Sequence, residues 1–373
     1  MLRKYVSILV LINFLVPFSS SAVSPRKKVK VGILEGLAVV DSTSSERYRQ
    51  IFESSLYYAL GSVDRELSSC GYQLEVDEEF FDASDKYAAK TAAARLVSRG
   101  AWIVFGPRRS DHFIASVEGS GRVPVVSPMA GSRAVSNLRP PVFSMYPGVS
   151  KLAKAAVSEV SRRKYGKKFA AFVDASCLAC RDFLEEFTRV STGKLNRIFY
   201  LDSFGEAPDV VKLVEQLRTS QVDFLLLPNY SKFSGSVIRG IQDQFPTLKI
   251  VGADGWGDGQ FGFLEGYGIR PEIQGISVRG GLPADDLSER LGVVSLDRSW
   301  RGERLRPPIA SLAAISFFRR ISKDLCRSRP GSPPALHDYL SKQDADHFRE
   351  IAGVSIYELK DGQLRFSKYR ELP

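Results

Sequence analysis

Two cysteines three positions apart are the first residues in this sequence whose spacing suggests chemistry. Cys177 and Cys180 follow the apolar segment 168–174 and open a segment with helical periodicity. A Cys-x-x-Cys pair where a strand turns into a helix is the arrangement of thiol–disulfide oxidoreductases, because a helix N-terminus stabilises a thiolate. A redox enzyme is therefore one interpretation of the protein.

Other motifs of enzymes and cofactors are weak in this sequence. Residues 257–262 read GDGQFG, which matches a dinucleotide-binding pattern. The apolar segment before them ends too early for these glycines to form the required strand-to-helix turn. The three histidines have no zinc-ligand spacing to one another or to a cysteine. We expect no cofactor, no metal and no enzymatic activity.

Several polar residues stand where apolar segments end. Ser110 follows "AWIVFG", and Asp254 closes "LKIVGAD". Open α/β sheets bind their ligands at the carboxyl ends of their strands. A serine hydroxyl at a helix start can bind a carboxylate, and a carboxylate beside an aromatic ring can hold an ammonium. Each residue could equally be a helix cap or an ordinary turn residue.

Small and aromatic residues complete this group. A segment of small residues follows the strand-like "VPVVSP", and small side chains let the backbone approach a ligand closely. Tyr230 follows "VDFLLLP", and Trp256 stands two positions after Asp254. The candidate ligand-binding residues are Ser110, Ala130, Gly131, Ser132, Tyr230, Asp254 and Trp256.

The elements that must position these residues alternate between strand and helix. Apolar runs such as "VKVGIL" alternate with amphipathic segments over residues 29–127, and the same rhythm restarts over residues 151–254. Repeated strand–helix units predict an α/β fold with doubly wound parallel sheets. Because there are two such series of similar length, we expect two lobes joined at the proline-rich segment 137–148.

The N-terminus has the features of a secretory signal peptide. Arg3 and Lys4 precede an apolar run over residues 5–18, and small residues end at Ala22. The run is short for a membrane span, although an uncleaved anchor is the alternative. Removal of 22 of the 373 residues would leave 351, a length that suits two lobes. We expect export to the periplasm and no stable membrane insertion.

The charge and cysteine content limit the partners. The formal net charge is +10, and about +8 without Arg3 and Lys4. The basic residues are spread along the chain, so we expect no nucleic-acid partner and only a weak preference for anions. Four cysteines in an oxidising compartment favour disulfides over free thiols.

Taken together, these segments resemble the type I periplasmic solute-binding proteins of the branched-chain amino-acid type, whose fold is shared by the ligand-binding domains of metabotropic glutamate receptors. The resemblance runs from Val29 to about Ser322. It is carried, in family order, by "KVKVGIL", "AAARLVSRGAWIVFGPRRS", "RVPVVSPMAGS", "PVFSMYPG", "VDFLLLPNYSKFSGSVIRGI" and "LKIVGADGWGD". It implies two lobes joined by a three-crossover hinge, with a cleft that closes on a small ligand.

The resemblance also implies roles for individual residues. Ser110 matches the family's serine that binds the ligand α-carboxylate. Residues 130–131 match a segment "SPxAT" whose backbone and threonine hydroxyl contact an amino acid. Gly131 replaces that threonine, and Ser132 is the candidate substitute. The departure at Gly131 puts a standard amino acid in doubt as the ligand.

The second lobe supplies the other implied contacts. Tyr230 matches a tyrosine that lines the cleft, and Asp254 matches the acidic residue that binds the ligand ammonium. The resemblance divides the chain into a signal peptide at 1–22, lobe one at 28–145 plus 277–350, and lobe two at 146–276 plus 351–373.

The resemblance changes the interpretation of the Cys-x-x-Cys pair, because it places Cys177 and Cys180 in the first strand–loop–helix unit of lobe two. We expect them to form a local disulfide that stiffens a pocket loop, unless one of them pairs elsewhere. Cys70 and Cys326, both near helix ends in lobe one, are the candidate second pair.

Three hypotheses for the function follow. The leading one is a secreted, monomeric, non-enzymatic solute-binding protein that captures an amino acid or similar small polar ligand and delivers it to an ABC permease by hinge closure. The second is a periplasmic sensor or a protein-binding regulator of envelope enzymes on the same fold. The third is a thiol–disulfide oxidoreductase that uses Cys177 and Cys180.

Overall fold

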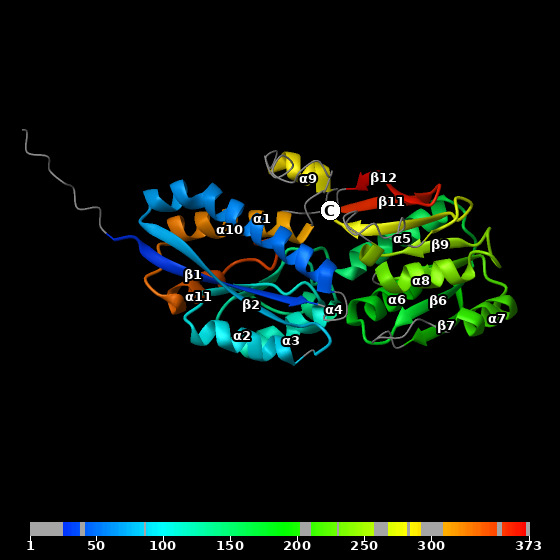
Figure 1. The fold of residues 1–373 in the computed structure, drawn as a ribbon, viewed down its shortest axis with the longest axis horizontal. Helices are drawn as coiled ribbons and strands as arrows, with labels where there is room; N and C mark the ends of the chain where they lie inside the picture. Colours follow the sequence, from blue (N-terminus) through cyan, green and yellow to red (C-terminus); the bar gives the residue numbers. More distant parts are fainter. Residues whose placement is uncertain are drawn as a thin grey trace, which may run out of the picture.

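The computed structural model describes residues 25–37, 42–85, 87–201, 210–229, 231–256, 268–281, 284–291, 309–348 and 353–370. The predicted signal peptide, residues 1–22, lies outside this range. The described residues form two α/β lobes that lie end to end along the long axis of the molecule (Figure 1). Each lobe is built on one sheet with helices on both faces, as the alternation of strands and helices predicts.

The first lobe contains a parallel sheet in the order β2-β1-β3-β4-β5. Its strands are β1 (Lys27–Leu37), β2 (Tyr72–Asp82), β3 (Ile103–Phe105), β4 (Val125–Ser127) and β5 (Val142–Ser144). Its helices are α1 (Ser42–Ser69), α2 (Ala88–Ser98), α3 (Ser110–Ser120), α4 (Arg133–Ser136), α9 (Ala284–Arg290), α10 (Ile309–Ser328) and α11 (Pro333–Leu340).

Strand β1 lies in the middle of the first core. Val29, Val31 and Ile33 share one hydrophobic cluster with α1 and α10. Leu34 belongs to the cluster on the opposite face, together with Leu96 of α2. A strand buried on both faces is typical of a parallel sheet. Each fully buried side chain of this size contributes about 1.5–3 kcal/mol to folding.

Two helices that are distant in the sequence close this lobe. α10 packs beside α1, as Figure 1 shows in orange and blue. A disulfide joins Cys70, just after α1, to Cys326 in α10, across a sequence separation of 256 residues. The C-terminal part of the chain therefore returns to complete the first lobe.

The second lobe contains a mixed sheet in the order β12-β11-β10-β9-β8-β6-β7. Its parallel strands are β6 (Lys168–Asp174), β7 (Lys194–Leu201), β8 (Phe224–Leu227), β9 (Lys249–Gly252) and β10 (Gly275–Gly280). The antiparallel pair β11 (Val354–Lys360) and β12 (Gln363–Arg370) extends it. Its helices are α5 (Val149–Arg162), α6 (Leu178–Val190), α7 (Val210–Ser220), α8 (Ser231–Ile241) and the 3-10 turn η1 (Asp254–Trp256).

The central strand β6 shows why this sheet needs helices on both sides. Phe169 and Val173 pack in the cluster formed with α5 and α6. Phe172 points to the opposite face and packs with α7 and α8. Successive side chains of a strand alternate between its faces, so an apolar run buries both of them.

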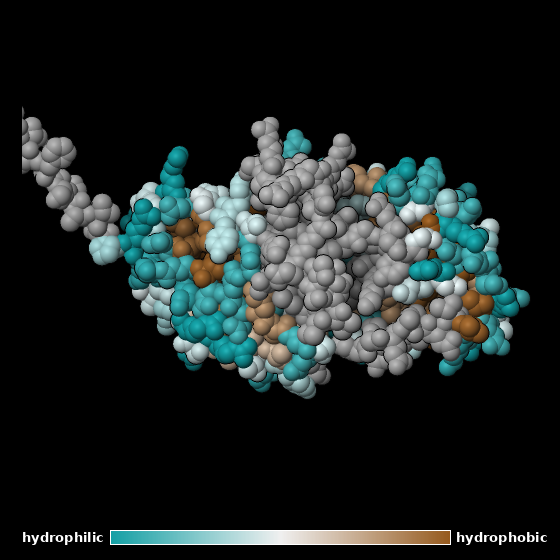
Figure 2. Space-filling model, in the orientation of Figure 1, coloured by the Kyte–Doolittle hydropathy of each residue, from teal (hydrophilic) through white to brown (hydrophobic). Residues whose placement is uncertain are grey.

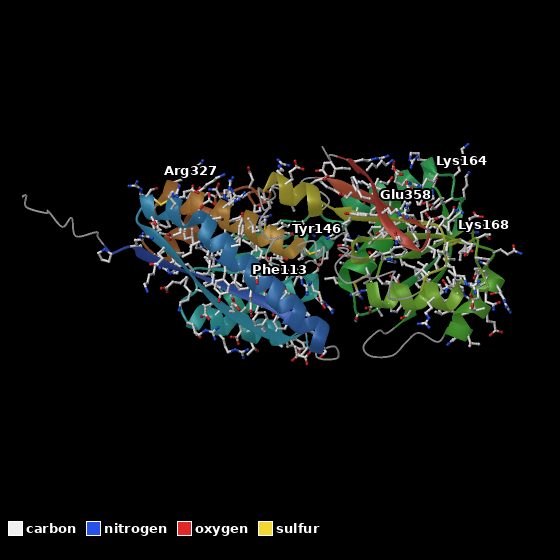
Figure 3. All side chains as sticks on the ribbon, turned by 45° about the horizontal axis from the view of Figure 1, so that its top comes forward. Phe113, Tyr146, Lys164, Lys168, Arg327 and Glu358 are labelled. Atoms are coloured by element: carbon white, nitrogen blue, oxygen red, sulfur yellow. A yellow bond between two sulfur atoms is a disulfide. The ribbon has the colours of Figure 1, made fainter. Side chains whose placement is uncertain are left out.

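The terminal hairpin is tied to the second lobe by charges. Glu159 of α5 is fully buried and pairs with Lys368 at 2.6 Å and with Arg370 at 2.6 Å. Burial acts to raise the pKa of Glu159, but hydrogen bonds from Arg162 and Lys368 lower it to about 2. The last strand is therefore held by a carboxylate that stays ionised. Figure 3 labels Glu358 on the neighbouring strand β11.

The chain crosses between the lobes three times in this arrangement: between β5 and α5, between β10 and α9, and between α11 and β11. β10 pairs with β9 and β11 of the second sheet, and Gly280 still pairs with Val354. The sequence-based boundary at residue 277 divides this strand. We therefore propose that lobe two extends to Gly280 before the chain returns to lobe one.

The surface at both ends of the molecule is mainly hydrophilic where the described residues are visible (Figure 2). Among the helices of the described ranges, none is both long enough and apolar enough to cross a membrane.

The long-range disulfide generates a stability prediction. Replacing Cys70 and Cys326 by alanine is expected to lower the free energy of unfolding by about 2–4 kcal/mol, because the unfolded chain would regain the freedom of a long loop. Urea denaturation measures this loss. The control is the double alanine variant of Cys177 and Cys180, whose sequence separation is 3 residues. An equal or larger loss in the control would contradict the argument from loop closure.

Candidate ligand-binding site

The turn between β3 and α3 positions the first candidate residue, Ser110. Gly106 in this turn has a φ of 102°, and a Cβ atom there would lie 2.0 Å from the carbonyl oxygen of Leu34. Glycine is therefore needed for the turn to pass this close to β1. The hydroxyl of Ser127, at the end of β4, donates to the carbonyl oxygen of Pro107 at 2.7 Å. The ends of three neighbouring strands are thus fixed relative to one another.

The structure brings Ser110 and Ser132 into direct contact. The backbone N–H of Ser132 donates to the Ser110 hydroxyl oxygen at 3.1 Å. Ser110 is 4% exposed and Ser132 is fully buried. The Ser132 hydroxyl caps α4 by accepting from the backbone N–H of Val135 at 3.3 Å. Two predicted ligand residues therefore already stabilise the loop between β4 and α4.

The neighbouring residues Ala130 and Gly131 are held by their backbone. The N–H of Ala130 donates to the Ser127 hydroxyl at 2.9 Å, and its carbonyl oxygen accepts from the Ser144 hydroxyl at 2.6 Å. The carbonyl oxygen of Gly131 accepts from the N–H of Val149 at 2.7 Å. This loop is therefore held beside the first crossover, and Ala130 packs in the core of lobe one.

Tyr146, in the first crossover, contacts residues from two distant parts of the chain. Its ring lies against Gly131, where a Cβ atom would be 3.2 Å from the ring Cδ1. It also lies against Gly280, where a Cβ atom would be 2.5 Å from the ring Cζ. The backbone N–H of Gly280 donates to the Tyr146 hydroxyl at 2.5 Å. Figure 3 labels this residue near the middle of the molecule, where the lobes meet.

Asp254 approaches the same tyrosine from the second lobe. It begins η1, directly after β9, and the charge of its carboxylate acts on the Tyr146 hydroxyl. Burial raises the pKa of Tyr146 well above 10, and the nearby charge of Asp254 raises it further. The guanidinium of Arg279 in β10 acts in the opposite direction. The phenol therefore stays protonated and can donate to Asp254.

The structure places the other predicted aromatic residues differently. Trp256 is 1% exposed and packs in the core of lobe two, and its indole N–H donates to the carbonyl oxygen of Leu227 at 2.9 Å. Its ring fills the space beside Gly252, where a Cβ atom would lie 2.2 Å from the indole Cε2. We therefore assign Trp256 to the core and leave it out of the proposed site. Tyr230 lies outside the described residues.

The Cys-x-x-Cys pair forms a disulfide at the start of α6. Cys177 and Cys180 are both buried and belong to the core of lobe two. Thiol exchange requires an accessible sulfur that can act as a thiolate. The buried position therefore disfavours redox catalysis and favours a structural role in the loop after β6.

In lobe two, Asn229 links the end of β8 to the end of β6, two strands that are more than fifty residues apart in the chain. Its side-chain oxygen accepts from the N–H of Asp174 at 2.7 Å, and its amide nitrogen donates to the carbonyl oxygen of Phe172 at 2.7 Å. The position of an asparagine directly after the proline that ends "FLLLP" is the sequence signal that could have identified it. Asn229 fixes the ends of β6 and β8, from which the lobe-two side of the site is built.

A direct contact between the lobes lies close to the serine loop. The backbone N–H of Arg133 in α4 donates to the carboxylate of Asp182 in α6 at 2.8 Å. The guanidinium of Arg133 pairs with Asp182 and with Glu185. No local sequence pattern indicates this contact, because its partners are distant in the chain and lie on helix surfaces.

Buried ionisable groups lie close to Ser110 in the chain or in the sheet. Glu35, at the end of β1, is buried and accepts from the Arg108 side chain at 2.9 Å. Burial raises the pKa of Glu35, although Arg108 opposes this shift. His112, in the first turn of α3, is 2% exposed. Burial lowers the pKa of His112 to about 4, with further lowering by Arg109 and Arg108 and an opposing effect of Asp111.

Comparison with known proteins identifies the fold. No protein-family model matches the chain, and no curated protein matches it significantly. Among solved structures, the chain is similar to the isoleucine complex of the branched-chain amino acid transporter substrate-binding protein LivJ from Streptococcus pneumoniae. The TM-score is 0.74 at 16% identity, and the match covers 93% of this chain and 99% of LivJ.

Two further structures show the range of similar proteins. A leucine-, isoleucine-, valine-, threonine- and alanine-binding protein from Brucella ovis matches with a TM-score of 0.72 at 11% identity, over 92% of this chain and 95% of that protein. An ABC transporter solute-binding protein from R. palustris in complex with 4-hydroxybenzoate matches with a TM-score of 0.69 at 15% identity, over 92% and 96%.

The chain therefore has the type I periplasmic binding protein fold, with two mostly parallel sheets. This confirms the fold predicted from the sequence. The same fold occurs in the transporter solute-binding proteins named above.

The contact between Gly131 and Tyr146 can be tested by a double-mutant cycle. Gly131→Thr is expected to cost about 1–3 kcal/mol, because the new Cβ atom would crowd the tyrosine ring. Combining it with Tyr146→Val should cost less than the sum of the single changes, because the smaller side chain leaves room for threonine. Free energies from urea denaturation measure the coupling, and strictly additive costs would contradict the contact.

The buried imidazole of His112 predicts a pH-dependent stability. Its folded-state pKa of about 4 lies below the unfolded value of about 6.5, so the unfolded chain binds more protons. Its effect on stability is unchanged above about pH 6.5, and stability is lost as the pH falls toward about 4. Between pH 7 and 5, the wild type should lose about 2 kcal/mol more than His112→Gln. Urea denaturation at each pH measures the free energy of unfolding. An equal loss in both proteins between pH 7 and pH 5 would contradict this prediction.

Proposed function

We propose that the protein is an exported solute-binding protein of an ABC transporter, and that it captures a small carboxylic acid between its lobes. The proposal is supported by three linked interactions. In lobe one, the N–H of Ser132 donates to the Ser110 hydroxyl, and Gly131 lies against the ring of Tyr146. From lobe two, the charge of Asp254 acts on the Tyr146 hydroxyl. Polar groups from both lobes thus converge at the ends of their strands, where open α/β sheets bind ligands.

Ser110 is the proposed anchor for the carboxylate. Its hydroxyl oxygen accepts from Ser132, and the hydroxyl proton is a donor that a carboxylate can accept. Ser110 also stands in the first turn of α3, where the helix dipole favours a negative charge. The backbone of residues 130–132 shapes the pocket beside it. We therefore propose that the ligand-binding residues of lobe one are those expected from the sequence: Ser110, Ala130, Gly131 and Ser132.

Ligand binding would be coupled to the arrangement of the lobes. A solute that contacts both lobes stabilises the arrangement in which both sets of contacts are made. Arg133 of α4 and Asp182 of α6 already meet across the lobes. We propose that a closed state of this kind is what an ABC permease in the membrane would recognise.

The solved structures of similar fold support a carboxylic acid as the ligand class. The LivJ structure contains isoleucine, and the R. palustris protein contains 4-hydroxybenzoate. These two ligands share a carboxylate and differ in nearly everything else. The periplasmic location that we propose depends on the predicted signal peptide at residues 1–22, which directs export.

A thermal-shift screen of α-amino acids and small carboxylates tests the proposal, because a ligand that binds only the folded state raises the melting temperature. Ser110→Ala should weaken the best-binding acid about tenfold, the loss expected for a hydrogen bond to a charged group. Calorimetric titration measures the affinity.

The matched control for this prediction is Ser116→Ala. Ser116 lies on the same helix, is buried, and donates within the helix to the carbonyl oxygen of Phe113. It should bind the acid as the wild type does. Equal losses in both variants would refute the anchor role of Ser110. A wild type that binds no acid at all would refute the function, and would favour the sensor or regulator hypothesis.

A further inference from the structure

Glu35 is a buried carboxylate with one oxygen that is hydrogen-bonded and one that is not. The residue is 3% exposed. Its Oε1 accepts from the backbone N–H of Gly36 at 3.2 Å and from Nε of Arg108 at 2.9 Å. Its Oε2 is buried and accepts from no group in the part of the chain that the structure describes. An unmatched buried acceptor is costly, so this oxygen would gain from a donor that a ligand brings.

Glu35 lies in a part of β1 that extends beyond its neighbour. β1 pairs with β2 on one side and with β3 on the other. β3 ends at Phe105, which is opposite Ile33, whereas β1 continues to Leu37. In place of a strand, the Arg108 side chain from the turn after β3 contacts Glu35. The carboxylate is therefore directed toward the carboxyl end of β3.

The helices that follow β1 and β3 lie on opposite faces of the sheet (Figure 1). α1 shares one core cluster with Val31 and Ile33. Phe113 of α3 shares the cluster of the other face with Leu34. Two neighbouring parallel strands whose helices depart in opposite directions define a switch point, and open α/β sheets bind ligands outside the carboxyl ends of such strands. Glu35 and Arg108 stand at this point of the first sheet.

The partner of Glu35 belongs to the same turn as the proposed carboxylate anchor. Arg108 stands two residues before Ser110. The Ser127 hydroxyl holds the turn by donating to the carbonyl oxygen of Pro107 at 2.7 Å. One short segment therefore positions a hydroxyl that can donate to a ligand and an ion pair whose carboxylate can accept from it.

The unmatched oxygen restricts the ligand groups that can bind to it. An ionised carboxylate only accepts hydrogen bonds, so the matching group is an O–H or N–H donor. Burial raises the pKa of Glu35, and Arg108 opposes this shift. A donor at Oε2 would act in the same direction as Arg108, because a hydrogen bond to the charged form stabilises that form. A ligand without such a donor would leave Oε2 without a partner.

We propose that Oε2 of Glu35 accepts a hydrogen bond from the ligand, so that the site selects small carboxylic acids that also carry a hydroxyl or amino group. This inference rests on the proposed function, because it names the ligand class of the same site. It assigns Glu35 as a residue that determines specificity, while Arg108 holds its other oxygen.

Matched pairs of acids test this inference on the wild-type protein by thermal shift and calorimetry. The members of each pair differ by one donor group: 4-hydroxybenzoate with benzoate, 3-hydroxybutanoate with butanoate, 4-aminobutanoate with butanoate, and L-leucine with 4-methylpentanoate. In the best-binding pair, the acid with the donor should bind at least about tenfold more tightly, the gain expected for a hydrogen bond to a charged group. The hydroxyl and amino pairs distinguish the two kinds of donor.

Two outcomes separate this inference from the proposed function. Equal or tighter binding of the donor-free member of the best-binding pair would overturn the inference and leave the proposed function intact. Failure of every acid in the panel to bind would overturn the proposed function itself.

Glu35→Gln tests the role of the unmatched oxygen. Because Arg108 donates to Oε1, the glutamine oxygen should stay beside Arg108, and its NH₂ group should take the position of Oε2. An acceptor is thereby replaced by a donor. The variant should bind the donor-bearing acid of the best pair at least about tenfold more weakly than the wild type does. It should bind the donor-free acid about as tightly as the wild type does.

The matched control is Glu79→Gln on the neighbouring strand β2. The two carboxylate oxygens of Glu79 accept from Arg95 and from Arg99, so both already have partners within the protein. The control should keep the wild-type preference for the donor-bearing acid. An unchanged preference in Glu35→Gln, an equal loss of both acids in that variant, or the same change in the control would overturn the role of Glu35.

Discussion

The hydrogen bond between the Gly280 N–H and the Tyr146 hydroxyl is the interaction on which the arrangement of this molecule depends. It joins the first crossover to the end of β10, where the chain leaves the second sheet. Through its ring the same tyrosine contacts Gly131 of lobe one, and its hydroxyl feels the charge of Asp254 of lobe two. One side chain thus links both lobes and two of the connections between them, so its position sets the geometry of the site.

Further hydrogen bonds hold the segments that Tyr146 contacts. The hydroxyls of Ser127 and Ser144 hold the loop that carries Gly131, and Val149 at the start of α5 bonds to the Gly131 carbonyl. On the other side, Asn229 fixes the ends of β6 and β8 next to β9, which leads into Asp254. Most of these bonds are buried, so each would be costly to break. The folded protein therefore holds these strand ends and the loop that carries Gly131 in place.

The lobes and the general place of the site could be predicted from the sequence, because alternating apolar and amphipathic segments reflect local geometry. Ser110 and Asp254 could be proposed from the sequence because the carboxyl ends of parallel strands converge. The contacts of Tyr146 could not be predicted, since Gly280 lies more than a hundred residues away in the chain. The spacing of Trp256 from Asp254 predicts a ligand contact, but the indole of Trp256 packs in the core after the η1 turn, so Trp256 stays outside the proposed site. Local patterns indicate where a strand ends, and only the packed structure shows which side chains point into the site.

Titration of the Tyr146 phenol measures whether its hydroxyl is buried between the lobes beside Asp254. In a protein labelled with ¹³C at tyrosine Cζ, the Tyr146 signal is assigned by its loss in Tyr146→Phe. We expect this signal to show no ionisation through about pH 9–11, where an ordinary phenol ionises. We also expect Asp254→Asn to lower the pKa of Tyr146, because the nearby negative charge is removed. Ionisation near pH 10 in the wild type, or a pKa of Tyr146 that does not change in Asp254→Asn, would show that Tyr146 does not link the lobes in this way.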